Sequence, residues 1–207
     1  MAIEAVVACA ESEQAISRMD GFEARLRALF PAIGMLHPEG GSGDVSLAHV
    51  LQTAALALQA QAGCPVTFAR TTATIDPGVY QVVVEYSEEA VGRQAFEDAQ
   101  RLINAALGQG DFDAEAAIAN LRELDEDERL GPSTGSIVDA AVARGIPYRR
   151  LTRGSLVQFG WGSKQRRIQA AEVDSTSAVA ESIGQDKDLT KRLLHAAGVP
   201  VPLGRPV

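Results

Sequence analysis

The sequence predicts an α+β fold, in which helices pack on a mixed or antiparallel sheet. Short runs of alternating apolar residues, typical of strands, interleave with longer runs in which apolar residues recur at helical spacing. The two patterns do not form regular strand–helix–strand units, which argues against a parallel sheet. The 207 residues are 46% hydrophobic and 22% charged, and these ordinary values for a globular protein exclude a disordered or fibrous chain.

The first part of the chain contains most of the predicted elements. Strands are predicted over residues 3–10, 67–73 and 79–86. Helices are predicted over residues 21–30, 45–61, 88–107 and 113–129. We expect a glycine-rich loop over residues 40–44, a turn at Asp76-Pro77-Gly78, and a helix cap at Ser87. The last of the four helices is strongly acidic, so most of its surface must be solvated.

The second part begins after the break at Gly131-Pro132. Ser133 or Thr134 is expected to cap a helix that runs to residue 143. Further strands are predicted over residues 147–152, 156–159 and 167–170, the first two as a hairpin or as two separate short strands. Further helices are predicted over residues 177–184 and 187–197.

The composition limits the classes of partner and the cellular compartment that we expect. The 19 basic and 27 acidic residues give a formal net charge of −8, so we expect no nucleic-acid partner. No apolar run reaches the roughly 18 residues that a membrane span needs, and the first ten residues do not resemble a secretory signal. Cys9 and Cys64 are too few for a disulfide framework, which favours a cytoplasmic location.

A series of specific motifs follows residue 129. They read LGPST at 130–134, RGIP at 144–147, QFGWG at 158–162, QRRIQA at 165–170, TSA at 176–178, DKDLTK at 186–191 and GVPVPLG at 198–204. Upstream, ARTTAT at 69–74 and PGVYQVVVEY at 77–86 complete the series. In this order the motifs resemble cyanophycin synthetases, at the passage from the N-terminal domain into the ATP-grasp domain.

The resemblance implies a polymer-binding N-terminal domain over residues 1–148, then a linker and the incomplete start of an ATP-grasp domain over residues 149–207. It implies a parent enzyme, an ATP-dependent acid–amino-acid ligase, that polymerises aspartate and arginine into cyanophycin. A later domain similar to the Mur ligases adds the arginine, and both centres use ATP and Mg²⁺. The family also implies a homotetramer. We expect this stretch to be a fragment that binds the polymer, with no cofactor and no ligase active site of its own.

Several residues are candidates for contacting that polymer. Arg166 and Arg167 offer guanidinium groups to carboxylates, although one could instead pair with the acidic helix and the other be solvated. Arg70 is a third candidate, with a surface ion pair as its alternative. The hydroxyls of Ser175, Thr176 and Ser177 precede a helix, where they hold an anion or where Ser175 or Thr176 simply caps the helix. The acidic helix could receive the polymer's arginine side chains, or be a solvated face.

The helix over residues 45–61 raises the question of a metal. Some members of the resembled family carry His-x-x-Glu-His here, a zinc-binding pattern with a glutamate base. This chain has His49-Val50-Leu51-Gln52-Thr53, and neither the amide nor the hydroxyl replaces the lost groups. We therefore expect no metal, and interpret His49 and Glu85 as remnants of a lost site. A zinc-dependent hydrolase of the polymer is thus disfavoured, and an oligomerisation scaffold is the other alternative to a polymer tether.

Overall fold

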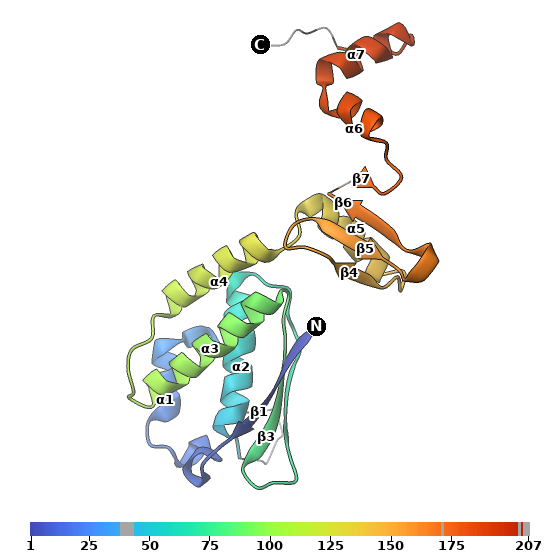
Figure 1. Ribbon diagram of the computed structural model, residues 1–207. Coiled ribbons are helices and arrows are strands. Elements are labelled where there is room, and N and C mark those ends of the chain that lie inside the picture. Colours follow the sequence, from blue (N-terminus) through green and yellow to red (C-terminus); the bar gives the residue numbers. More distant parts are fainter. Residues whose placement is uncertain (38–43, 171, 203, 205–207) are drawn as a thin grey trace. The chain divides into compact units, whose positions relative to one another are not determined.

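The computed structural model describes residues 1–37, 44–170, 172–202 and 204 (Figure 1). The chain divides into two compact units, Met1–Arg129 and Leu130–Val207. Each unit has helices and an antiparallel sheet, which confirms the α+β prediction. Of the expected glycine-rich loop, residues 40–43 lie outside the described part of the chain. None of the helices in that part is long and apolar enough to cross a membrane.

The first unit is built on a three-stranded sheet in the order β1-β3-β2, with β1 Ala2–Ala8, β3 Val79–Glu85 and β2 Ala69–Ala73. Alternation decides which side of each strand is buried. Val82 and Val84 of β3 are buried, while Gln81 between them is exposed. All three predicted strands of this unit are therefore confirmed, within two residues at each end.

Two helices, α2 Leu47–Ala62 and α3 Glu89–Ala106, cover the buried face of this sheet. Two more, α1 Phe22–Leu29 and α4 Ala114–Glu128, pack against these helices (Figure 1). α2 and α3 pack against each other, and the small residues Ala54, Ala55, Ala95 and Ala99 of these helices are completely buried. α4 buries only its Ala117 and Leu121, so its acidic face is solvated as predicted.

One local prediction for this unit is wrong, and three short elements were not predicted. Ser87 does not cap α3, whose N-cap is Glu88. The Ser87 hydroxyl instead donates to the Asp125 carboxylate of α4 at 3.1 Å, since an ionised acceptor makes the stronger hydrogen bond. Three short 3₁₀ helices, Glu11–Glu13, Ile16–Arg18 and Pro31–Ile33, were not predicted, because three-residue elements leave no periodicity in the sequence.

The second unit holds a four-stranded antiparallel sheet in the order β4-β5-β6-β7. Its elements are α5 Pro132–Val142, β4 Tyr148–Arg150, β5 Leu156–Phe159, a 3₁₀ helix Gly162–Lys164, β6 Arg166–Gln169 and β7 Glu172–Val173. Val138 of α5 packs on Val157 and Ile168 to form the small core. The predicted hairpin is confirmed, whereas β7 was not predicted.

The predicted cap of α5 is wrong. Its N-cap is Gly131, with Pro132 in the first turn, where a missing N–H costs nothing. Thr134 instead donates its hydroxyl to the Ala170 carbonyl at 3.3 Å. This hydrogen bond ties α5 to the residue that follows β6.

The last two helices, α6 Ala178–Gln185 and α7 Lys187–Ala196, contain no buried residue. Val179 is 70% exposed and Leu193 is 47% exposed. The structure groups α5 with the second sheet, whereas the family-based boundary at residue 148 rests on sequence resemblance and stays a prediction. The assignment of residues 149–207 to the start of an ATP-grasp domain likewise stays a prediction.

Candidate functional site

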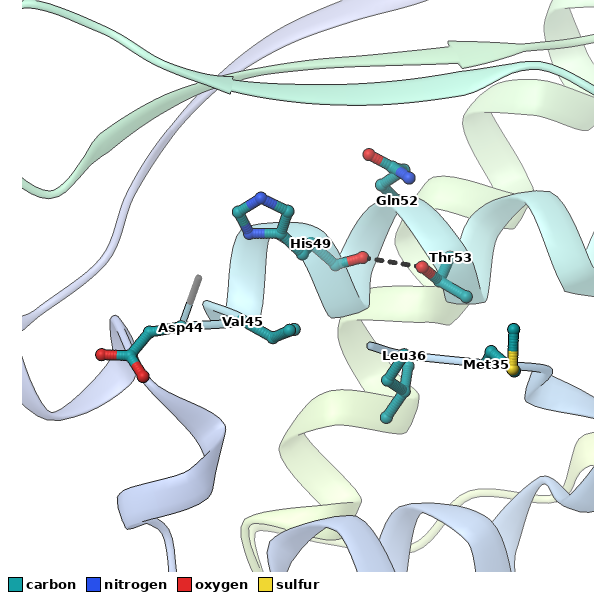
Figure 2. Close-up of a pocket in the computed structure, with 7 residues that line it drawn as sticks. All are labelled: Met35, Leu36, Asp44, Val45, His49, Gln52 and Thr53. Carbon is teal, nitrogen blue, oxygen red and sulfur yellow. Dashed lines mark hydrogen bonds between the residues drawn. The ribbon is translucent and has the colours of Figure 1, made fainter. Parts of the chain in front are cut away.

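The first two turns of α2 open onto a cavity of about 320 Å³. Its described lining residues are Met35, Leu36, Asp44, Val45, His49, Gln52 and Thr53 (Figure 2). Figure 2 shows that His49, Gln52 and Thr53 come from α2, while Met35 and Leu36 come from the preceding segment. This cavity contains the positions at which the sequence raised the question of a metal.

His49 is held by the residue that begins its own helix. The Ser46 N–H donates to Nδ1 at 3.3 Å, and the Ser46 hydroxyl lies 2.8 Å from the same nitrogen. Nδ1 is thus the acceptor, and the neutral ring carries its hydrogen on Nε2. The ring also packs edge-on against Tyr80 of β3, with 5.6 Å between ring centroids. Burial lowers the pKa of His49, so the imidazole is neutral at pH 7.

Gln52 and Thr53 occupy the positions of the glutamate and the second histidine in the zinc-binding pattern, and their surroundings are not those of metal ligands. The Thr53 hydroxyl donates to the His49 carbonyl at 3.0 Å, a local bond within the helix. The Gln52 Oε1 is buried and lacks a hydrogen-bond partner among the described residues. Across those residues, no group of three His, Cys, Asp or Glu side chains is placed to hold a metal ion.

Glu85 lies at the opposite end of α2 from His49. Its carboxylate accepts the N–H groups of Thr67 at 2.7 Å and Phe68 at 2.8 Å, and these bonds lower its pKa. Its main-chain carbonyl accepts a hydrogen bond from Gln59, ten residues beyond His49. Ten helical residues span about 15 Å, so the structure does not bring His49 and Glu85 together. Glu85 anchors the entry to β2 instead.

Arg70 lies on the face of the first sheet that the helices leave uncovered. The register aligns Arg70 of β2 with Val83 of β3 and Glu4 of β1. Arg70 is exposed, and Glu4 accepts a hydrogen bond from Gln81. Arg70 therefore has room to contact a ligand, and it belongs to a different unit from Arg166 and Arg167.

Arg166 and Arg167 point to opposite faces of the second sheet, because neighbouring residues of a strand alternate. Arg166 shares the face of Ile168, which α5 covers, and donates to the Gln165 carbonyl at 3.1 Å. Arg167 lies on the open face, opposite Gln158 of β5, and Gln158 lies opposite Arg149 of β4. Arg149 was not predicted as a candidate, because only the register of three strands places it in a row with Arg167.

Two of the three hydroxyl side chains before α6, those of Thr176 and Ser177, make local hydrogen bonds. Ser177 is the N-cap of α6, and its Oγ accepts the Ala180 N–H at 3.0 Å. Thr176 Oγ1 accepts the Val173 N–H at 3.2 Å. The predicted cap at Ser175 or Thr176 is therefore wrong by one or two residues. Ser175 is exposed in the turn after β7.

The two compact units have opposite net charges. Met1–Arg129 has 8 Lys and Arg against 21 Asp and Glu, a formal charge of −13. Leu130–Val207 has 11 Lys and Arg against 6 Asp and Glu, a formal charge of +5. Each unit thus attracts ligand groups of the opposite sign, which the overall charge of −8 conceals.

Comparison with known proteins supplies a family. A family model described as the cyanophycin synthase-like N-terminal domain matches residues 5–108. Proteins named cyanophycin synthetase from Trichormus variabilis and from Nostoc sp. are each 42% identical to this chain over 161 residues. A protein of the same name from Geminocystis herdmanii is 40% identical over the same length. Each match covers 76% of this chain and 18% of the relative, so the chain spans under a fifth of the relatives' length.

Proposed function

Because the chain belongs to the family of cyanophycin synthase-like N-terminal domains, we propose that it is the amino-terminal part of a cyanophycin synthetase and that it holds the growing polymer. A tether of this kind raises the concentration of the chain end at an active site without taking part in the chemistry. The ligase steps, with their ATP and Mg²⁺, belong to ATP-grasp and Mur ligase-like domains of the parent enzyme. The parent is proposed to be a cytoplasmic homotetramer.

The chemistry of the polymer supports a binding surface that has both positive and negative charges. Each repeat has an aspartate main-chain unit whose side-chain carboxyl is joined to the α-amine of an arginine. This linkage leaves one guanidinium and one free carboxylate in every repeat. The −13 charge of Met1–Arg129 suits the guanidinium groups, and the +5 charge of Leu130–Val207 suits the carboxylates.

The observation that carries the proposal is the row Arg149–Gln158–Arg167 on the open face of the second sheet. Strands lie about 4.8 Å apart, so the two arginines are about 10 Å apart with an amide between them. Both arginines are exposed, and no ion pair within the described residues occupies either of them. Guanidinium forks on a rigid sheet match carboxylates well, which makes this row the proposed binding site for the carboxylates of the polymer.

Other candidates lie outside this face of the second sheet. We propose that Arg70 contributes from the first unit, and that Arg166 and the Ser175–Ser177 turn contribute from the second. The acidic face of α4 supplies acceptors for guanidinium groups, with the exposed carboxylates of Glu115, Glu123, Glu126 and Asp127. Charge alone supports these assignments, so they are secondary to the arginine row.

The test is fluorescence anisotropy of end-labelled, soluble cyanophycin titrated with the full chain. We expect saturable binding, and binding about tenfold weaker in the double variant Arg149→Glu/Arg167→Glu. The control Arg144→Glu/Arg192→Glu makes the same charge change in the same unit, and it should bind within about twofold of the unaltered chain. No binding at millimolar repeat concentration, or equal loss in both double variants, would contradict the proposal. A defined oligomer in light scattering without any polymer affinity would support the scaffold alternative.

A further inference from the structure

The last turn of α4 carries charges that oppose the end of a helix. Its final four residues are Asp125, Glu126, Asp127 and Glu128, and the turn contains no basic residue. The free carbonyl groups at a helix C-terminus already carry partial negative charge, so carboxylates at that end destabilise the helix. Glu126 and Asp127 are exposed, and no ion pair within the described residues neutralises either of them.

The N-terminal half of α4 is held by contacts that do not involve this turn. Phe112 is buried just before the helix, and the Arg101 guanidinium lies 5.8 Å from the centroid of its ring. The Asp113 carboxylate caps the helix. In the middle of α4, Leu121 is completely buried, and Arg122 donates to a carbonyl of α2 at 3.4 Å. The first half of α4 can therefore stay docked while the second half moves.

Polar contacts hold the C-terminal half of α4. Leu124 is only partly buried. The Asp125 carboxylate accepts the Ser87 hydroxyl at 3.1 Å and the Cys64 thiol at 3.7 Å. Arg129 comes no closer than 3.9 Å to the same carboxylate, and its side chain is 59% exposed, so this ion pair adds little. The docked state of this half thus depends on a few weak contacts around one carboxylate.

The Cys64 thiol reports on these contacts. Cys64 follows α2 and is 5% exposed, and its sulfur meets α4 through Asp125. Burial raises the pKa of this thiol, so it is protonated and unreactive in the docked state. Because Asp125 belongs to α4, undocking of the C-terminal half removes this contact and makes the thiol accessible.

We propose that residues 122–128 form an electrostatic latch, which opens and closes over Cys64 while the rest of the first unit stays folded. Repulsion among the carboxylates and with the helix dipole favours the open state. Cations that screen these charges favour the closed state. The latch does not depend on polymer binding, so it goes beyond the proposed function. Because α4 is the last element before the second unit, the latch also changes how much chain connects the two units.

Alkylation of the full chain with iodoacetamide, followed by mass spectrometry of the peptides, tests the latch. Iodoacetamide is uncharged, so its approach to an acidic surface does not depend on salt. We expect Cys64 to be alkylated about fivefold to tenfold more slowly in about 0.5 M NaCl than in about 0.02 M NaCl. Cys9 is buried beside Gly78 and serves as the internal control, and its rate should change less than about twofold.

A pair of charge variants tests the cause of the opening. Glu126→Gln/Asp127→Asn removes two carboxylates from the last turn, so Cys64 should be alkylated about threefold to fivefold more slowly at low salt. The control Glu97→Gln/Glu115→Gln removes the same charge from exposed positions in α3 and in the first turn of α4. This control should not slow the alkylation of Cys64, because neither carboxylate lies at the C-terminal end of α4.

Ser87→Ala tests the closed state without changing any charge. It removes a hydrogen bond to Asp125, so Cys64 should be alkylated about fivefold faster than in the unaltered chain. Circular dichroism of each variant checks that the fold is retained. A Cys64 rate that is independent of salt, or equal effects of the two double variants, would overturn the proposal. Equal slowing of Cys9 and Cys64 by salt would also overturn it, because the whole unit would then respond and not the latch alone.

Discussion

Gly92→Ala tests how closely α3 sits on the first sheet. A Cβ at Gly92 would lie 2.6 Å from the Tyr86 Cβ and 3.2 Å from the Ile3 Cδ1. The Tyr86 Cβ is one bond from a main chain that is itself hydrogen-bonded to Met1, so it cannot rotate away. Alanine gains about 1 kcal/mol over glycine in a helix interior, whereas overpacking costs about 1–3 kcal/mol.

A contact this short places the cost at the upper end of that range. We therefore expect a net loss of about 1–2 kcal/mol, which lowers the melting temperature by about 3–8 °C for a unit of this size. Gly135→Ala in α5 is the control, because its Cβ would meet nothing nearer than 3.7 Å. This control should gain the stability that alanine provides over glycine in a helix, and it should therefore raise the stability of the second unit. Thermal unfolding followed by circular dichroism measures both variants. A Gly92→Ala variant as stable as the unaltered chain would refute the close packing of α3.

Three further predictions concern protonation and one hydrogen bond. The pKa of Glu85 lies below its ordinary 4.5, because two N–H groups stabilise the ionised form; its contribution is full above that value and is lost as the pH falls. The stability difference between the unaltered chain and Glu85→Gln, measured by urea unfolding, should thus shrink between about pH 6 and about pH 3. Burial lowers the pKa of His49 below 6.5. The folded protein is therefore most stable above pH 6.5, where the imidazole is neutral, and its stability decreases as the pH falls below that value. His49→Gln should show a smaller drop in urea midpoint than the unaltered chain between about pH 7.5 and about pH 5. Ser87→Ala removes the hydroxyl that donates to Asp125, and a loss of about 1 kcal/mol is expected in the same assay.

Periodicity predicted the long elements well, because burial on one face dictates the pattern. Val82 and Val84 alternate with exposed residues, and the apolar stripe of α2 is buried where the pattern indicated. β7 has two residues, too few for any alternation to register. The Ser87 cap failed because a carboxylate 38 residues away competes for the hydroxyl, and a local pattern cannot contain that contact.

The candidate site was less predictable, since it depends on strand register. Arg166 and Arg167 are adjacent in sequence and yet lie on opposite faces of a sheet. Arg149 aligns with Arg167 only through the pairing of β4, β5 and β6. The separation of His49 from Glu85 follows from the parallel packing of β3 on α2, in which the end of the strand meets the end of the helix.

Isothermal titration of the full chain with soluble cyanophycin, and in parallel with poly-aspartate of equal length, measures the central claim most directly. We predict saturable binding of cyanophycin that weakens with added salt, and much weaker binding of poly-aspartate, which lacks the guanidinium arms. Equal affinity for the two polymers, or no heat of binding with cyanophycin at millimolar repeat concentration, would contradict the account.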